Sequence, residues 1–481
     1  MAGLQCEKRV WLTVHEKALA TPPDAATQAR FDAGTEVGEC AHALFPGGVL
    51  VEEKPWQHEQ ALARTQRLMA DSTVPAIFEA AFEHEGVRIR VDVLERLHGG
   101  AWGLREVKMS ASLKEEHLDD IAVQRWVLEG AGLQVASSEL IHVDTSCECG
   151  EAGIDWKRFF ARVPCDAEIE EPLRRVPERV RRFHEVLRER EAPAIEPGFH
   201  CSKPYDCEFW QHCTRDKPED WIRYLPSLQE PRFLELGGAG HERISQLPAD
   251  AKLSNTQQRV RDVLQSGEPF VSPDLHEALS SAGPPAWYLD FETASPAIPM
   301  FAGTHPYQVL PFQWSLHRVD ANGHVSHEFF LAEGPDDPRR AFCESLLEAL
   351  PADAAPIHVY SSYEATRLRE LAAEFPSLAA GLDAISARLF DQLSLVRQHL
   401  YHPGFDCSFS IKQVAPALAQ GFGWDDLHDI AEGTAAAAAW PLLARGELES
   451  DEAARTREAL LAYCARDTLA MVELHRALRE L

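Results

Sequence analysis

The alternation of apolar and polar positions changes along the chain and divides it into three stretches. Residues 1–220 mix helical periodicity with short strand patterns and end in a cysteine-rich loop, whereas Pro and Gly repeatedly interrupt residues 221–285. From residue 286 onward, strand patterns come first and helical patterns follow. We therefore expect an α/β protein with domains at 1–220 and 286–481, joined by a helical connector at 221–285.

The C-terminal stretch carries four short apolar runs with strand character, at 286–293, 311–319, 327–333 and 356–362. Helical periodicity marks three further segments, at 337–350, 363–375 and 452–478. This order of elements predicts a sheet with helices packed against it.

Composition and charge limit the functions that fit this chain of 481 residues. No apolar run reaches the roughly 18 residues of a membrane helix, and the first twenty residues lack a secretory signal. We therefore expect a cytoplasmic protein. The net charge of −29 counts against non-specific nucleic-acid binding by the whole surface. The arginine-rich strip 174–190 is either a local phosphate contact or a solvated helix with interleaved Glu.

The segment 86–110 carries the first group of candidate catalytic residues, on two antiparallel strands with a turn at Gly99-Gly100. Asp92 lies in the first strand, and Glu106 and Lys108 lie two apart in the second, so they share an exposed face. Carboxylates on adjacent strands can hold a divalent metal, and a lysine can orient water or phosphate beside it. Taken alone, this spacing also fits a solvated hairpin.

The order of these motifs strongly resembles the PD-(D/E)xK nucleases of the RecB family, over about residues 1–215. The resemblance implies a restriction-endonuclease-like fold that uses Mg²⁺ or Mn²⁺. It implies these metal ligands: Asp92, Glu106 and the carbonyl of Val107. By the same resemblance Lys108 is catalytic, and Gln124, on a helix expected at 119–132, belongs to the family's helix motif.

Two positions depart from the family's pattern. Gly38 stands at the place of an early Gly-x-x-x-His motif, with His42 one turn later. Leu128 stands where the helix motif often ends in Tyr. These departures leave the metal site less complete than in the family.

Three cysteines recur every six residues in the segment 201–213, and a fourth, Cys6, lies near the start of the chain. Eleven cysteines in a chain expected in the cytoplasm do not indicate disulfides, so their spacing points to metal. Thiolates alone leave zinc and an iron–sulfur cluster open, with His200 or His212 as zinc ligands. Cys147 and Cys149 form a Cys-x-Cys pair that could compete.

The cysteine layout resembles RecB-like nucleases of the CRISPR-associated and AddB type. Those proteins pair one N-terminal cysteine with three C-terminal cysteines around a [4Fe–4S] cluster, which clasps the two ends of the domain. The segment LQCEKRVWL resembles their N-terminal element. The resemblance therefore implies a [4Fe–4S] cluster bound by Cys6, Cys201, Cys207 and Cys213.

The C-terminal stretch contains a second set of acids. Asp290 and Glu292 lie two apart at the end of an apolar strand, so both carboxylates point the same way. Tyr463 and Asp467 lie four apart on a predicted helix and share a face. Acids from a strand and from a distant helix suit two-metal phosphoryl hydrolysis, although Asp-x-Glu alone also fits an exposed strand end.

Together these motifs resemble the DnaQ-like 3′–5′ exonucleases of the RNase H fold, over about residues 286–481. The resemblance implies catalytic residues, with Mg²⁺ or Mn²⁺ on the acids, at Asp290, Glu292, Tyr463 and Asp467. The family's middle motif offers Asn and then Asp, where this chain has Ser361 and Glu364. Glu364 is the candidate for that role, and Asp391 is another.

The whole chain resembles a bacterial family of unknown function that joins a cluster-bearing RecB-like nuclease to a DnaQ-like domain. The segments PFQWSLH and SFSIKQVAPAL, the latter after Tyr-His-Pro, add to the match. This resemblance favours a metal-dependent nuclease with two active sites in repair or defence, acting on DNA rather than RNA. Two alternatives stay open: a nucleic-acid-binding scaffold with one or both sites degenerate, and an RNA-processing nuclease.

Overall fold

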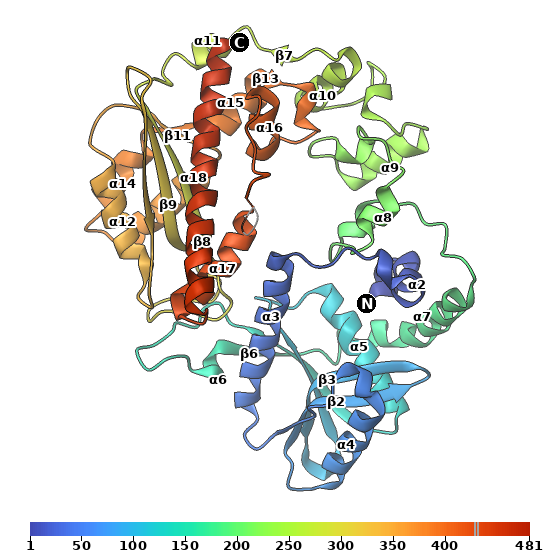
Figure 1. Ribbon diagram of the computed structural model, residues 1–481. Helices are drawn as coiled ribbons and strands as arrows, with labels where there is room; N and C mark the ends of the chain where they lie inside the picture. Colours follow the sequence, from blue (N-terminus) through green and yellow to red (C-terminus); the bar gives the residue numbers. More distant parts are fainter. Residues whose placement is uncertain (428–429, 431) are drawn as a thin grey trace. The chain divides into compact units, whose positions relative to one another are not determined.

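The computed structural model describes residues 1–427, 430 and 432–481 and divides the chain into two compact units (Figure 1). The first unit contains Met1–Arg215 and Pro296–Gln308, and the second contains Asp216–Ser295 and Val309–Leu481. Each unit is built around a mixed β-sheet with helices against it, so the predicted α/β class is confirmed. The segment 221–285, expected as a connector, belongs to the second unit.

The sheet of the first unit has six strands in the order β1-β2-β3-β4-β5-β6. β2, β3 and β4 form an antiparallel meander, and β4 then pairs parallel to β5. The predicted hairpin is present, because Val93 of β3 lies opposite Arg105 of β4. Gly99 and Gly100 between them have φ of 76° and 83°, a region that favours glycine. The strands are β1 Val49–Leu50, β2 Ala76–His84, β3 Val87–Arg96, β4 Trp102–Lys108, β5 Val135–Val143 and β6 Phe160–Pro164.

The helices of the first unit cover both faces of this sheet. On one face, Leu94 and Leu104 pack in a core with Ile121 and Leu128 of α5, so Leu128 serves packing. On the other face, α3 contributes to a core with β4 and the segment 296–308. The helices are α1 Ala2–Gln5, α2 Glu7–His15, α3 Ala25–Cys40, α4 His58–Ala70, α5 Glu115–Gly130, α6 Trp156–Phe159, α7 Glu170–Arg188 and α8 Trp210–Thr214.

The segment 296–308 joins the first unit although it connects two strands of the second. Ala297 and Ile298 pack in the core with α3 and β4. The backbone N–H of Cys149 donates to the Thr304 carbonyl at 2.9 Å, and that of Gly303 donates to the Cys149 carbonyl at 2.8 Å. The sequence pattern did not predict this insertion.

The sheet of the second unit has five strands in the order β10-β9-β8-β11-β12. β10, β9 and β8 are antiparallel, while β8, β11 and β12 are parallel. Four of the strands match the runs expected from the sequence. A separate pair joins β7 Phe270–Val271, within the expected connector, to β13 Leu400–Tyr401. The sheet strands are β8 Ala286–Ala294, β9 Leu310–Val319, β10 Val325–Leu331, β11 Ile357–Val359 and β12 Leu389–Asp391.

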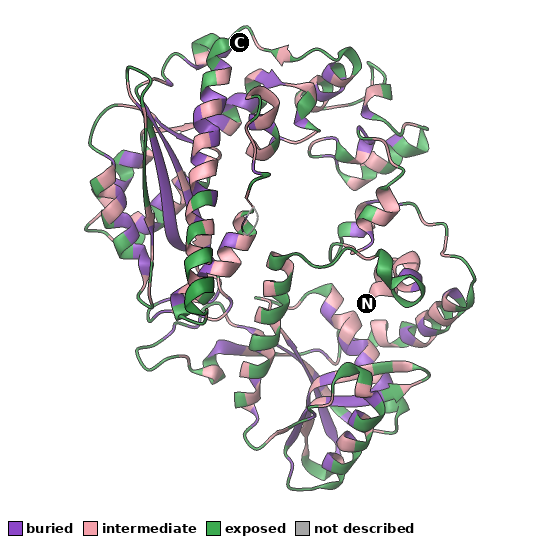
Figure 2. Ribbon diagram, viewed as in Figure 1, coloured by how far each residue is buried: buried purple, intermediate pink, exposed green. Residues whose placement is uncertain are grey.

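Strand β8 is buried on both faces, as the purple strands of this sheet show in Figure 2. Trp287, Leu289 and Phe291 pack against a core with α12, α13 and α14. Tyr288 faces Met471 and Val472 of the long helix α18. Because side chains alternate along a strand, Asp290 and Glu292 lie on the α18 face.

The remaining helices of the second unit surround this sheet. They are α9 Glu230–Gly238, α10 Asn255–Ser266, α11 Leu275–Ala278, α12 Pro338–Ala349, α13 Tyr363–Glu374, α14 Ala379–Ser386, α15 Gln392–His399, α16 Ile411–Leu418, α17 Gly433–Arg445 and α18 Ser450–Glu480. Asp451 and Glu452 in the first turn of α18 complement the positive end of its dipole. Among the described residues, we find no helix with the length and apolarity needed to cross a membrane.

Candidate functional sites

The first carboxylate cluster lies where β3, β4 and α5 meet. Glu106 Oε1 forms an ion pair of 2.5 Å with Lys108 Nζ, and its Oε2 accepts a hydrogen bond of 2.5 Å from Gln124 Nε2. Asp92 Oδ2 accepts a hydrogen bond of 2.7 Å from the backbone N–H of Val107. The structure therefore brings together the four side chains that the sequence singled out, and places the Val107 backbone beside them.

Asp120 is a member of this cluster that sequence reasoning missed. Its Oδ2 lies 2.9 Å from Lys108 Nζ, so Lys108 is half-buried between two carboxylates and does not stand on an exposed strand face. Asp120 lies on α5 one turn before Gln124, and this spacing of four was the available signal.

Burial sets the electrostatics of the first cluster. It raises the pKa of Asp92 to about 7, against the opposing effects of Lys108 and the Val107 N–H. Burial and then the charges of Asp92 and Asp120 raise the pKa of Glu106 well above its usual value. Burial alone would lower the pKa of Lys108, but the surrounding carboxylates outweigh it and raise that pKa. The cluster is therefore an environment in which additional positive charge is favourable.

The early helix contributes packing near this sheet. His42 follows α3 in a short 3₁₀ helix and stacks on Phe78 of β2, with ring centroids 3.8 Å apart and planes 12° apart. Burial lowers the pKa of His42, which favours the neutral ring. Nothing would crowd a side chain at Gly38, where the structure leaves open space.

The four predicted cluster cysteines line one small hollow of the first unit. Gln5 closes the N-terminal segment onto the cysteine loop, because its Nε2 donates to the carbonyls of His200 and Tyr205 at 2.8 and 2.7 Å. The N–H of Cys207 donates to the Cys201 carbonyl at 2.8 Å, which tightens that loop. The residues that line the hollow include Cys6, Cys201, Cys207 and Cys213.

The donor set tests which metal group the hollow fits. Burial raises the pKa of Cys207 to about 11, and nearby Cys201 adds to the effect. Among the described residues, the compact group of donor atoms lying within 4.8 Å of one another is a different one, in the second unit. A tetrahedral zinc ion with Zn–S of about 2.3 Å would hold its sulfurs about 3.8 Å apart. Among the described residues, the four cysteines of the hollow do not form a group that compact.

The competing thiol and imidazole donors have other surroundings. Cys147 packs in the core with Val37 and Ile141, and Cys149 is buried and held by the 296–308 segment. His200 Nε2 lies 3.5 Å from Cys201 Sγ, so this imidazole stands beside the cysteine hollow.

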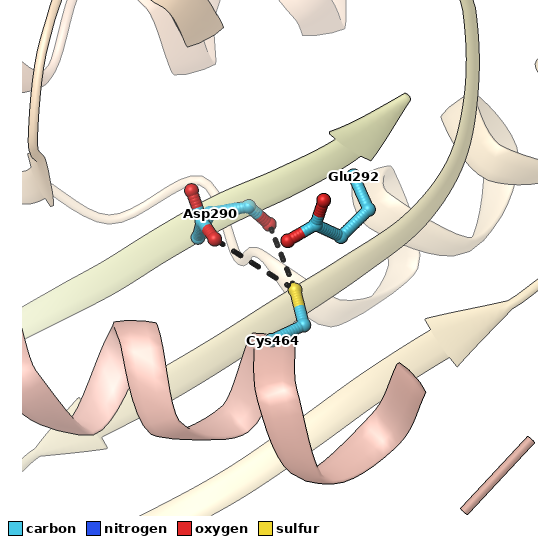
Figure 3. Close-up of side chains that lie close together, drawn as sticks. All are labelled: Asp290, Glu292 and Cys464. Atoms are coloured by element: carbon cyan, nitrogen blue, oxygen red, sulfur yellow. Dashed lines mark hydrogen bonds between the residues drawn. The ribbon is translucent and has the colours of Figure 1, made fainter. Parts of the chain in front are cut away.

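The second carboxylate cluster lies between β8 and α18. Figure 3 shows Asp290 and Glu292 on the strand with the thiol of Cys464 facing them from the helix. Cys464 Sγ lies 3.9 Å from both the backbone carbonyl oxygen and Oδ2 of Asp290. One donor atom from each of the three residues lies within 4.8 Å of the others. Sequence reasoning missed Cys464, although it directly follows Tyr463.

The helix acid of this cluster is held by two hydrogen-bond donors. Asp467 Oδ1 accepts a bond of 2.7 Å from Trp424 Nε1, and the carboxylate also pairs with the Tyr463 hydroxyl. The ring of Tyr463 lies 4.9 Å from the ammonium of Lys412 on α16. Lys412 lowers the pKa values of Glu292 and Asp467, so it faces the acids. Lys412 was not predicted as a site residue, although its segment was noted.

The middle acid comes from the start of α13. Glu364 is 3% exposed and shares a hydrogen bond with Asp290, whereas its Oε2 has no partner among the described residues. Asp391 caps α15 instead, accepting from the Ser394 N–H at 3.2 Å and the Ser394 hydroxyl at 2.6 Å. The Ser361 hydroxyl accepts from the Tyr363 N–H at 3.0 Å and so shapes the start of α13.

Burial and mutual repulsion raise the pKa values of this cluster. Burial raises the pKa of Glu292 to about 8, with Asp467 adding to the effect. The pKa of Asp290 rises well above its usual value through burial and then through Glu292, Asp467 and Glu364. Four acids with one lysine therefore favour a bound cation, which would remove the repulsion.

The arginine-rich strip lies mostly on α7 and is partly neutralised. Arg175 pairs with Glu171, Arg179 with Asp119 and Arg182 with Glu7. Exposed arginines on another stripe of the same helix, Arg174, Arg181 and Arg188, carry no ion pair among the described residues. Part of the strip is therefore a solvated helix with interleaved Glu, and part is open for anions.

Comparison with models of protein families gives a match to part of the chain. Residues 287–410 match the family model described as a domain of unknown function, DUF2779. The matched segment begins at β8 and includes Asp290, Glu292 and Glu364, but it ends before Lys412 and Asp467. The search of curated proteins gives no match. This segment is therefore similar to a domain whose description names no chemistry.

Proposed function

We propose that this protein is a metal-dependent nuclease with two separate active sites, acting on DNA in preference to RNA. In this proposal the first unit is a PD-(D/E)xK domain of RecB type and the second is a DnaQ-like domain of the RNase H fold. The proposal rests on an arrangement of acidic side chains that occurs in both units. In each, carboxylates from a strand and a helix converge in a buried cluster with one lysine beside them.

The arrangement of the first cluster supports hydrolysis of a phosphodiester. Asp92 and Glu106 would bind Mg²⁺ or Mn²⁺, which when bound activates water and stabilises charge on the phosphate. Gln124 and Lys108 each hold one oxygen of Glu106, so they fix the orientation of this carboxylate. The Lys108 ammonium is close enough to the acids to contact the phosphate as well.

The second cluster supports the same chemistry on another scaffold. The strand order, with two antiparallel and two parallel neighbour pairs, puts Asp290 and Glu292 on the central strand, opposite α18. Glu364 shares a hydrogen bond with Asp290, so the longer side chain reaches the place of the expected middle Asp. Tyr463 is bonded to Asp467 and lies against Lys412, a position from which its hydroxyl can orient water.

The cysteine hollow supports a structural [4Fe–4S] cluster in the first unit. Cys6 comes from the junction of α1 and α2, and the other three cysteines come from residues 201–213. Binding all four would tie two segments that are about 200 residues apart in sequence, so metal binding would stabilise this unit.

Digestion of end-labelled single- and double-stranded DNA and RNA with Mg²⁺ or Mn²⁺ tests the proposal. Full-length Lys108→Ala should lose the activity of the first site, and Asp290→Asn should lose metal-dependent 3′-end trimming. Lys157→Ala, at an exposed lysine on α6, is the matched control. A double variant of Lys108 and Asp290 that digests at the wild-type rate would overturn the proposal. DNA and RNA binding without digestion would instead support a scaffold.

A further inference from the structure

The thiol of Cys464 is the feature of the second unit that the expected nuclease chemistry leaves unexplained. It is fully buried, faces β8 from α18, and lies 3.9 Å from Asp290 Oδ2 (Figure 3). Together with Asp290 and Glu292 it forms the compact set of donor atoms within 4.8 Å. A sulfur beside two carboxylates changes which cation the site would prefer.

A second observation also points to a ligand at this place. Glu364 is only 3% exposed and shares a hydrogen bond with Asp290. Its Oε2 has no hydrogen-bond partner among the described residues. An unpaired buried carboxylate oxygen costs free energy that a cation would offset. The open acceptor therefore belongs to a residue that is bonded to Asp290, one of the two carboxylates that Cys464 faces.

The carboxylate of Asp467 on α18 is already engaged in hydrogen bonds. Asp467 accepts from Trp424 Nε1 and pairs with the Tyr463 hydroxyl, so donors already engage this carboxylate. Cys464, one turn of helix away, is the helix donor that joins the strand pair in the compact set. Its distance to Asp290 is also suitable for a shared ion. Zn–S bonds of about 2.3 Å and Zn–O bonds of about 2.1 Å place donors about 3.5 Å apart, so small side-chain rotations suffice.

We propose that Asp290, Glu292 and Cys464 form a mixed oxygen and sulfur site that binds Zn²⁺ in preference to Mg²⁺. This inference rests on the proposed metal-dependent function and identifies its metal. On binding, the sulfur–hydrogen bond breaks, the proton leaves to solvent, and the thiolate forms the bond to zinc. Thiolate is a soft ligand that Mg²⁺ does not favour, whereas zinc accepts thiolate and carboxylate alike.

The test measures metal binding by the full-length, cluster-loaded protein, so that its readout is independent of digestion. Calorimetric titrations with Zn²⁺ and with Mg²⁺ would compare wild type with Cys464→Ser, Asp290→Asn and Cys343→Ala. Cys343 is the matched control, because it is a fully buried thiol of the same unit in an apolar core. Substitution of Co²⁺ adds a spectroscopic signature, since a cobalt–thiolate bond gives a charge-transfer absorption band.

We expect the cobalt–thiolate difference band in wild type and Cys343→Ala, and its loss in both Cys464→Ser and Asp290→Asn. The serine change should weaken Zn²⁺ binding at least roughly 100-fold, the upper end of the effect of losing an outer-shell partner. It should leave Mg²⁺ binding unchanged. Because Asp290→Asn keeps the thiol, it tests the site even where the serine variant folds poorly.

Two failures are distinguishable. An unchanged cobalt band and unchanged Zn²⁺ affinity in Cys464→Ser, with Mg²⁺ binding that depends on Asp290, would overturn the thiolate site and leave the proposed nuclease function standing. Equal binding of every divalent ion by wild type and Asp290→Asn would remove both the thiolate site and the second active site.

Discussion

Replacement of Asp92 by Asn removes a buried charge while retaining a hydrogen bond, and we expect it to stabilise the metal-free protein. Asp92 Oδ2 accepts from the Val107 N–H at 2.7 Å, and the amide oxygen of Asn can accept the same bond. The change therefore removes mainly the cost of an ionised carboxylate in this environment. Activity of the first site should be lost, so stability and function should move in opposite directions.

The size and pH dependence of this effect follow from the pKa of Asp92. The difference of about three pH units between 3.8 and about 7 corresponds to roughly 4 kcal/mol. Because the folded pKa lies above the unfolded value, the native state binds more protons, and stability falls as pH rises between about 4 and about 7. Above pH 7 the cost is constant. Since Asp92 keeps some solvent exposure, we expect about half of this destabilisation, or about 2 kcal/mol, as the gain in unfolding free energy from Asp92→Asn at high pH.

Urea unfolding in the presence of a chelator at pH 4 and pH 8 measures the effect. Asp92→Asn should raise the midpoint of the first unit's transition at pH 8 and change it little at pH 4. Added Mn²⁺ should stabilise the wild type at pH 8 and leave the variant unchanged. A variant that is less stable than wild type at pH 8 without metal would refute this account of the cluster.

Three further predictions address other residues. Lys108→Ala should lower the unfolding free energy at pH 8 by about 3 kcal/mol, because the variant leaves buried carboxylates without the ammonium that pairs with them. Urea unfolding measures this loss, and an unchanged midpoint would contradict it. Cys207→Ser should lose most iron and sulfide after anaerobic purification, whereas Cys407→Ser in the second unit should keep them; colourless wild-type protein with stoichiometric zinc would count against the cluster. Lys412→Ala should shift the pH profile of 3′-end trimming to higher pH, because loss of the ammonium raises the pKa values of the acids it faces. The shift is measured in the Lys108→Ala background, and an identical profile would exclude this role.

Local patterns predicted four strands of the second unit and the hairpin of the first unit, but did not locate the other strands. The Gly99-Gly100 turn and the apolar alternation on either side determine which residues share a face, so Glu106 and Lys108 were expected together. The apolar residues within 286–293 similarly identified strand β8, and the structure adds that this strand is buried on both faces. These features depend on neighbours in sequence, which is why a single chain reveals them.

The missed residues depend on contacts between distant segments. Lys412 meets Tyr463 and Glu292 only after α16 packs near α18, and no local spacing signals that approach. Cys464 is one cysteine among eleven, and only the fold turns it toward Asp290. Asp120 had a weak signal in its helical spacing from Gln124, but its ion pair with Lys108 required the tertiary structure. The metals that these sites would bind stay a prediction.

The insertion of residues 296–308 into the first unit affects how this protein can be divided. A fragment that starts at residue 286 would carry Ala297 and Ile298 as exposed apolar side chains, and a fragment ending at Arg215 would lack part of a core. We therefore expect neither fragment to fold stably on its own. Cutting the chain between residues 215 and 286 would separate residues 296–308 from the rest of the first unit, so we expect both units to be inherited together as one chain.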